Sequence, residues 1–171
     1  MAESENGATA PAGESAGDVP MERHLVINAQ YVKDLSFENP RAPHSLLQQT
    51  GQPEVNLSVD VKAQNLAPNV FEVVLTVSTE AKIGSDSIFV VELVYGAVVT
   101  LQNVPEEAIP LAVLIETPRQ MFPFARSIIA NATRDGGYPP LLIHPIDFAE
   151  LLRRQQQARA TEPTPNVVGT A

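Results

Sequence analysis

SIFVVELVYGAVVTL, residues 87–101, predicts one β-strand that is apolar on both of its faces. One face would carry Phe89, Val91, Leu93, Tyr95, Ala97, Val99 and Leu101, and the other Ile88, Val90, Val94 and Val98. The protein's own helices can cover one face of an antiparallel sheet, so the apolar residues on the second face indicate a partner there. We therefore expect the chain to oligomerise through its sheet.

Three earlier segments alternate apolar and polar side chains with the two-residue period of a half-buried strand. Their apolar positions are Leu25, Ile27, Ala29, Tyr31, Leu35 and Phe37, then Val55, Leu57, Val59, Val61 and Ala63, then Phe71, Val73, Leu75, Val77, Ala81 and Ile83. The sequence IGSD, residues 83–86, predicts a tight hairpin before the fourth strand, because glycine readily adopts a positive φ. The four strands together predict an antiparallel β-meander.

After the fourth strand the apolar residues recur with the period of a helix. We expect this helix to begin near residues 105–107, which place two glutamates at the positive end of its dipole. Pro118 would stop or kink it. A second helical piece over residues 119–134 would end at the glycine pair 136–137.

The last part of the domain combines a proline-rich segment with one more helix. Residues 138–145, YPPLLIHP, contain three prolines and predict an extended crossover. Asp147 and Glu150 have the spacing of a capping box at the start of a C-terminal helix. The predicted fold class is therefore α+β: a four-stranded antiparallel meander followed by a Pro-broken helix, an extended crossover and a C-terminal helix.

The length of 171 residues predicts a single folded domain. Residues 1–22 contain acids but no lysine, no arginine and no apolar run, so they predict a disordered acidic leader and not a signal peptide. We expect the folded domain over residues 23–157 and a flexible tail over residues 158–171. No uncharged stretch approaches the roughly 20 residues that cross a bilayer, so we expect a soluble protein without direct membrane insertion.

The charge and the rare residue types exclude several functional classes. A formal net charge of −9 disfavours nucleic acid and favours basic or unfolded, partly cationic chains as partners. The chain has no cysteine and only three histidines, which are far apart in the sequence, so no disulfide or metal site is expected.

Candidate catalytic residues are few. His144 with Asp147 could form a base and its orienting acid, and His44 lies next to Ser45, but a packing role fits each histidine better. An anion site would require three separated arginines to converge, namely Arg119, Arg126 and Arg134. No Gly-rich phosphate loop opens a helix. We therefore expect a binding protein, not an enzyme, and no cofactor.

Acidic residues gather on the polar sides of two strands. Asp34, Ser36 and Glu38 share one face of the first strand, and Glu92 lies on the less apolar face of the fourth. They form either a solvated surface or an acidic docking patch that attracts a basic partner.

Four segments resemble the bacterial protein-export chaperone family SecB. They are YVKDLSFENPRAPH (31–44), QPEVNLSV (52–59), FEVVLTV (71–77) and MFPFARSIIANATRDGGYPPLLIHPIDF (121–148), and the resemblance extends over about residues 24–157. It implies a cytoplasmic homotetramer, a dimer of dimers. Such a protein holds unfolded secretory preproteins without ATP, keeps them competent for translocation and delivers them to the export ATPase SecA.

The resemblance also implies two sites. Its SecA-docking surface would fall on Asp34, Glu38, Val90 and Glu92. Its apolar client groove would lie between the sheet and the helix and crossover region, in or near Phe37, Leu46, Leu47, Met121, Phe122, Tyr138 and Leu141.

The chain departs from the family at two places. Residues 49–53, QTGQP, stand in a loop where many members carry an aromatic, and the tail after residue 160 has no convincing counterpart. One alternative hypothesis for the function remains: a SecB-like chaperone dedicated to a single antitoxin. That protein would prefer one client segment and would have little use for an acidic patch.

Overall fold

The computed structural model describes residues 24–47 and 51–161. The predicted acidic leader and the end of the predicted tail lie outside these residues. Within the described part of the chain, no helix is both long enough and apolar enough to cross a membrane.

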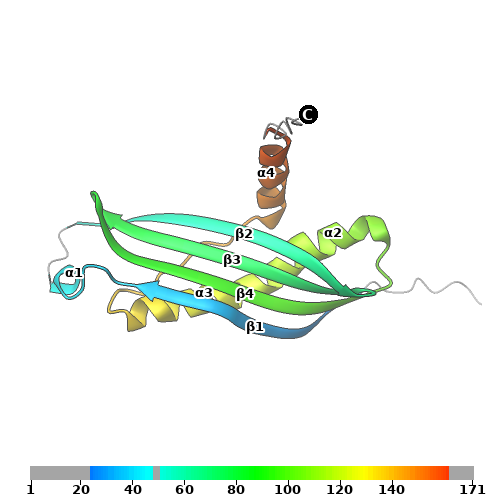
Figure 1. Cartoon of the computed structure of the whole chain (residues 1–171), viewed down its shortest axis with the longest axis horizontal. Coiled ribbons are helices and arrows are strands. Elements are labelled where there is room, and N and C mark those ends of the chain that lie inside the picture. Colours follow the sequence, from blue (N-terminus) through cyan, green and yellow to red (C-terminus); the bar gives the residue numbers. More distant parts are fainter. Residues whose placement is uncertain (1–23, 48–50, 162–171) are drawn as a thin grey trace, which may run out of the picture.

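Four long antiparallel strands form one sheet (Figure 1). They are β1 (His24–Glu38), β2 (Glu54–Ala67), β3 (Val70–Ile83) and β4 (Asp86–Gln102). Their order is β1-β4-β3-β2, so the α+β class is confirmed but the simple meander is wrong for β1, which pairs with β4. The long connection between β1 and β2, which contains the short helix α1 (His44–Leu47), makes this Greek-key order possible. β4 is apolar on both faces and therefore takes a central position.

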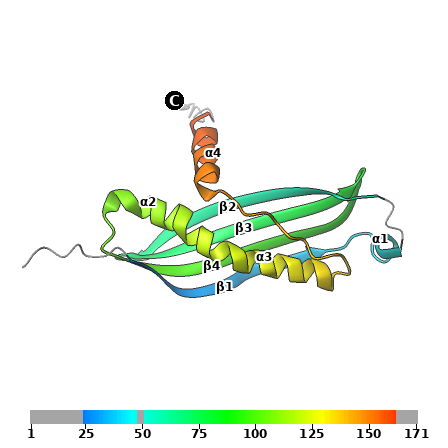
Figure 2. The same ribbon diagram turned by 180° about the vertical axis from the view of Figure 1, so that it is seen from behind.

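One nearly continuous helical segment covers one face of the sheet (Figure 2). It begins with a 3-10 turn, η1 (Glu106–Ala108), and continues through α2 (Ile109–Leu111), a π-helical segment η2 (Ala112–Glu116) and α3 (Thr117–Asp135). Pro118 does not stop the helix. The backbone N–H and the hydroxyl of Thr117 both donate to the carbonyl of Ala112, and this wider turn lies directly before the proline, which has no N–H to donate.

The core lies between the helices and this face of the sheet. The seven predicted inward residues of β4 are all buried, and Val91, Leu93, Ala97 and Val99 are fully so. Met121, Ala125 and Ile129, four residues apart along α3, are also fully buried against the sheet. On the opposite face, Val90, Val94 and Val98 are only half-buried. We call this uncovered side the open face.

Two β-bulges in β1 change the predicted face of its middle part. The pairing with β4 shifts by one residue between Ile27 and Ala29 and again between Val32 and Asp34. Ala29 and Tyr31 therefore lie opposite Val98 and Gly96 on the open face and not on the buried side, which corrects the alternation expected from the sequence. The second bulge restores the predicted face for Phe37, which lies opposite Val91.

The crossover and the last helix follow the predicted pattern. Helix α3 ends at Asp135, and Gly137 has the positive φ of +92° expected at a glycine stop. Residues 139–147 have no regular secondary structure. Helix α4 (Phe148–Thr161) projects beyond the β2 edge (Figures 1 and 2). Helix α4 continues to Thr161, so its last four residues, 158–161, overlap the predicted tail.

The N-terminus of α4 gives a pH prediction. Asp147 Oδ1 accepts hydrogen bonds from the N–H groups of Ala149 and Glu150, each 3.0 Å long. The Glu150 N–H chiefly, together with that of Ala149, holds the pKa of Asp147 below its ordinary value, although partial desolvation opposes them.

A depressed folded-state pKa contributes stability above the unfolded pKa and loses it as the pH falls through the folded pKa. We therefore expect amide-exchange protection at residues 149 and 150 to fall below about pH 4. NMR hydrogen exchange measures this effect. Asp147→Asn keeps the cap without a titrating group and should remove the pH dependence, whereas an unchanged dependence in that variant would contradict the assignment.

Candidate functional site

The open face brings the four predicted docking residues together. Glu38 lies directly opposite Val90, and Ser36 lies directly opposite Glu92. Asp34, two residues before Ser36, is on the same face and lies opposite Val94. Asp34, Glu38 and Glu92 are exposed. The alternation of the two strands thus places three carboxylates on neighbouring strands of a surface that none of the described helices covers.

A further carboxylate, Glu80 of β3, belongs to this surface and was not among the predicted docking residues. It lies opposite Val90, so Glu38 and Glu80 flank that valine on its two sides. Lys82 Nζ is 2.9 Å from Glu80 Oε2, and this hydrogen bond is the main cause that lowers the pKa of Glu80. The predicted hairpin at residues 83–86 was the sequence signal that could have placed Glu80 beside Val90. We call Asp34, Glu38, Glu80 and Glu92 the acidic patch.

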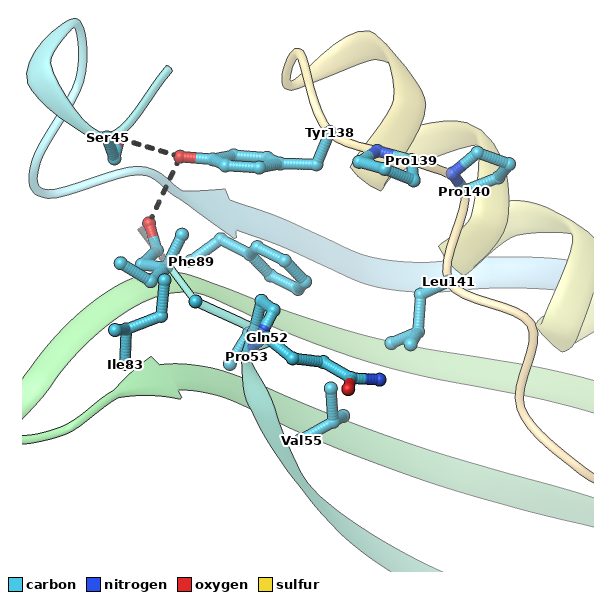
Figure 3. Close-up of a pocket in the computed structure, with 13 residues that line it drawn as sticks. Ser45, Gln52, Pro53, Val55, Ile83, Phe89, Tyr138, Pro139, Pro140 and Leu141 are labelled. Atoms are coloured by element: carbon cyan, nitrogen blue, oxygen red, sulfur yellow. Dashed lines mark hydrogen bonds between the residues drawn. The ribbon is translucent and has the colours of Figure 1, made fainter. Parts of the chain in front are cut away.

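An apolar groove lies on the helix-covered side, between the β2 edge and the crossover. Its first cavity, of about 250 Å³, is walled by residues that include Val55, Phe89, Tyr138 and Leu141 (Figure 3). A second cavity, of about 420 Å³, lies along Leu57 of β2 and residues 141–146 of the crossover. Val55 and Leu141 line both cavities, so the two are adjacent, and we call them together the groove.

Hydrogen bonds fix the end of the groove at Tyr138. The Tyr138 hydroxyl donates to Asn39 Oδ1 at 2.8 Å and also lies 2.8 Å from Ser45 Oγ. The Asn39 side chain additionally donates to the carbonyl of Gly136. These bonds tie the loop after β1 to the start of the crossover and so hold the Tyr138 ring over the cavity. Figure 3 shows the contact between the Tyr138 hydroxyl and Ser45.

Aromatic packing supports the same wall. The ring centroids of Phe89 and Tyr138 are 5.0 Å apart, and Phe37 stacks behind Phe89 at 6.0 Å. Gly136 is needed for this contact, because a Cβ there would lie 2.1 Å from Phe37 Cζ. The loop, β1 and the crossover therefore form one packed unit around the groove.

The predicted groove residues occupy four kinds of position. Tyr138 and Leu141 line the first cavity. Phe37 lies behind Phe89, and Leu46 and Leu47 are exposed on α1, by 39% and 78% respectively. Met121 and Phe122 are buried in the core and line neither cavity. Both side chains belong to the core in this structure, and their part in client binding stays a prediction.

Sequence reasoning missed the residues of β2 and the crossover that wall the groove. Val55 and Leu57 were assigned to the inward face, yet they are 42% and 44% exposed, because β2 is an edge strand and the helices do not reach them. Leu142 of the crossover is 61% exposed. The sequence signal for these groove walls was an apolar alternation in β2, which is an edge strand, together with the proline-rich crossover.

Four of the alternative catalytic and anion-binding groups have structural partners. Asp147 caps α4, and Ser45 Oγ lies within hydrogen-bonding distance of Tyr138 and Asn39. Arg119 pairs with Glu116 and Arg134 with its neighbour Asp135. Asp147 and Ser45 thus have structural partners. Arg119 and Arg134 each pair with a nearby carboxylate and do not converge on a common site.

Comparisons with known proteins agree on one family. The family model "Preprotein translocase subunit SecB" matches residues 19–159. The protein-export protein SecB of Rhodospirillum centenum is 54% identical over 133 residues, which are 77% of this chain and 79% of the relative. That of Parvibaculum lavamentivorans is 47% identical over 154 residues, or 90% of each chain.

A solved structure with the same fold is the SecB-like chaperone of Mycobacterium tuberculosis in complex with a ChAD peptide from an antitoxin. Its TM-score is 0.60 at 12% sequence identity, and the match covers 71% of this chain and 90% of that one. This likeness supports the fold, while the family model and the curated relatives cover most of the chain at about half identity. The chain therefore belongs to the SecB family.

Proposed function

We propose that this protein is an ATP-independent export chaperone that holds unfolded preproteins and delivers them to SecA. The apolar groove of two adjacent cavities beside an edge strand is the observation that carries the proposal. The protein acts by binding, not as an enzyme, in the bacterial cytoplasm.

The groove suits an extended client with little sequence preference. An unfolded segment offers apolar side chains, which the walls at Val55, Leu57 and Leu142 remove from water. It also offers free backbone groups, and β2 is the last strand of the sheet, so its outer edge pairs with no other strand of the described residues. Both kinds of contact disappear when the client folds, which lets the chaperone distinguish unfolded from folded precursors.

The acidic patch is the proposed SecA-docking surface. It lies on the open face, whereas the groove lies on the helix-covered side of the same sheet. A basic surface of SecA can therefore approach the patch while the client stays in the groove. Long-range attraction to the patch would speed this encounter with little effect on core stability.

Assembly is proposed to produce a homotetramer, a dimer of dimers. Exposed apolar side chains support it: Leu111 and Phe124 on the helices are each 53% exposed, and Val32 and Leu35 on the β1 edge are 45% and 44% exposed. Such side chains are better covered by further copies of the chain than left in water. The alternative of an antitoxin-dedicated chaperone is not favoured, since the relatives at about half identity are export proteins.

Native mass spectrometry tests the proposal directly. We expect an assembly of about four times the chain mass of 18.4 kDa. Mixed with a secretory precursor, it should bind the unfolded form and ignore the same precursor after folding. A monomer, or a tetramer that binds neither form, would contradict the proposal.

A further inference from the structure

The two bulges of β1 determine which residues face Glu92. Asn28 and Lys33 are the extra residues, because the pairing passes from Ile27↔Val99 to Ala29↔Val98 and from Val32↔Tyr95 to Asp34↔Val94. Together they advance the second half of β1 by two residues relative to β4. The side chains after the second bulge therefore keep their faces but meet different partners.

Without the bulges, the acidic patch would contain a direct clash of like charges. Continuing the register of Leu25↔Leu101 in single steps would pair Asp34 with Glu92. Like charges directly opposite each other destabilise an antiparallel pair. In the observed register Glu92 instead meets the small hydroxyl residue Ser36, and Asp34 lies diagonally from it.

Side chains hold both bulges in place. Asn28 Nδ2 donates to Thr100 Oγ1 on β4 at 2.7 Å. Lys33 Nζ is 2.7 Å from Glu72 Oε1 on β3. Glu72 also accepts a hydrogen bond from the Tyr31 hydroxyl. The second bulge is therefore tied to a carboxylate two strands away.

Glu72 is a buried charge on the open face. It is only 6% exposed, and Gln64 of β2 donates to its second oxygen, Oε2. Donors from both edge strands thus converge on one carboxylate. A buried carboxylate is tolerated only with such partners, and removing it would leave Lys33 and the Tyr31 hydroxyl without their acceptor.

Gly96 makes this arrangement possible. A Cβ at position 96 would lie 2.7 Å from Tyr31 Cζ, so the Tyr31 ring passes over β4 where a side chain is missing. The hydrogen bond from Lys33 is the main cause that keeps the pKa of Glu72 below its ordinary value. The hydrogen bond that Tyr31 donates to Glu72 is the main cause that raises the pKa of Tyr31 to about 12. At neutral pH the pair is therefore a carboxylate and a neutral hydroxyl donor.

We propose that Glu72 is a positioning residue for the acidic patch: through Lys33 and Tyr31 it sets the register of residues 34–38 against β4. The spacing of Asp34 and Glu38 from Glu92 then depends on a residue outside the patch. The register itself stands on the structure alone, and its consequence for SecA rests on the proposed function.

Disulfide cross-linking reads the register directly, because the natural chain has no cysteine. Directly opposite residues have Cα atoms within disulfide range, whereas diagonal neighbours are farther apart, at about 7–8 Å. Ser36→Cys with Glu92→Cys reports the observed register, and Asp34→Cys with Glu92→Cys reports the register without bulges. In the otherwise natural chain we expect only the first pair to close readily. Mixing isotope-labelled and unlabelled chains identifies bonds within one chain.

Each cysteine pair is then combined with Glu72→Gln or with Tyr31→Phe. We expect the 36/92 rate to fall about fivefold or more and the 34/92 rate to rise. Glu54→Gln, which removes an exposed carboxylate from β2, is the matched control and should leave both rates unchanged. Unchanged rates in folded Glu72→Gln and Tyr31→Phe chains would overturn the inference. Tyr31→Phe, which removes a single hydroxyl, provides the test if Glu72→Gln does not fold.

The consequence for SecA binding is tested with Glu72→Gln in a chain without introduced cysteines. We expect the Kd for SecA to rise about tenfold while the affinity for unfolded precursor stays unchanged. A lower SecA affinity with an unchanged register would overturn the positioning role. A changed register with full SecA affinity would instead contradict docking at Asp34, Glu38 and Glu92, so the two failures are distinguishable.

Discussion

Reversing two charges of the acidic patch, Asp34→Arg with Glu92→Arg, is expected to raise the Kd for SecA about 100-fold or more. The two residues lie diagonally on neighbouring strands, so the substitutions place two cations where the basic partner is expected to dock. Like-charge juxtaposition in an interface costs several kcal/mol, and each 1.4 kcal/mol is a factor of ten in affinity. Isothermal titration calorimetry with purified SecA measures the change.

The fold and the client groove should survive these substitutions. Both side chains are exposed, and the groove lies on the other side of the sheet. Glu106→Arg with Glu107→Arg changes the net charge equally at two exposed positions beyond the end of β4, so it is the matched control. Unchanged SecA affinity in the folded Asp34/Glu92 variant would show that docking occurs elsewhere.

Placing charge in the groove should remove most client binding. Leu57→Asp with Leu142→Asp introduces two carboxylates into the second cavity, whose walls both leucines form. Burying a leucine contributes about 1.5–3 kcal/mol, so losing two such contacts should weaken the affinity for unfolded precursor about 50-fold or more. Fluorescence anisotropy with a labelled, unfolded precursor measures this loss.

The second variant should remain folded, because the two leucines are 44% and 61% exposed in the protein as it stands. Leu66→Asp is its control: Leu66 is also in β2 and is 51% exposed, but it lines neither cavity. SecA affinity should not change in either variant. Normal client binding by the folded Leu57/Leu142 variant would exclude this groove as the client site.

The local pattern of the sequence determined the elements and much of their orientation. The two-residue period of residues 87–101 predicted the buried face of β4, and the seven inward side chains are buried. Asp147 and the glycine pair 136–137 marked helix ends correctly, because capping and left-handed backbone are set by a few adjacent residues. The faces of Asp34, Glu38 and Glu92 followed from the same alternation.

Tertiary structure decided what depends on neighbours distant in the chain. The strand order, the bulges at Asn28 and Lys33, and therefore the face of Tyr31 follow from pairing with β4 and from the reach of side chains to Glu72. The groove walls include apolar side chains of β2 that the helices leave uncovered, whereas Met121 and Phe122 are buried in the core. Periodicity defines which side of an element is apolar, but only packing determines whether that side meets the core, another copy of the chain or a client.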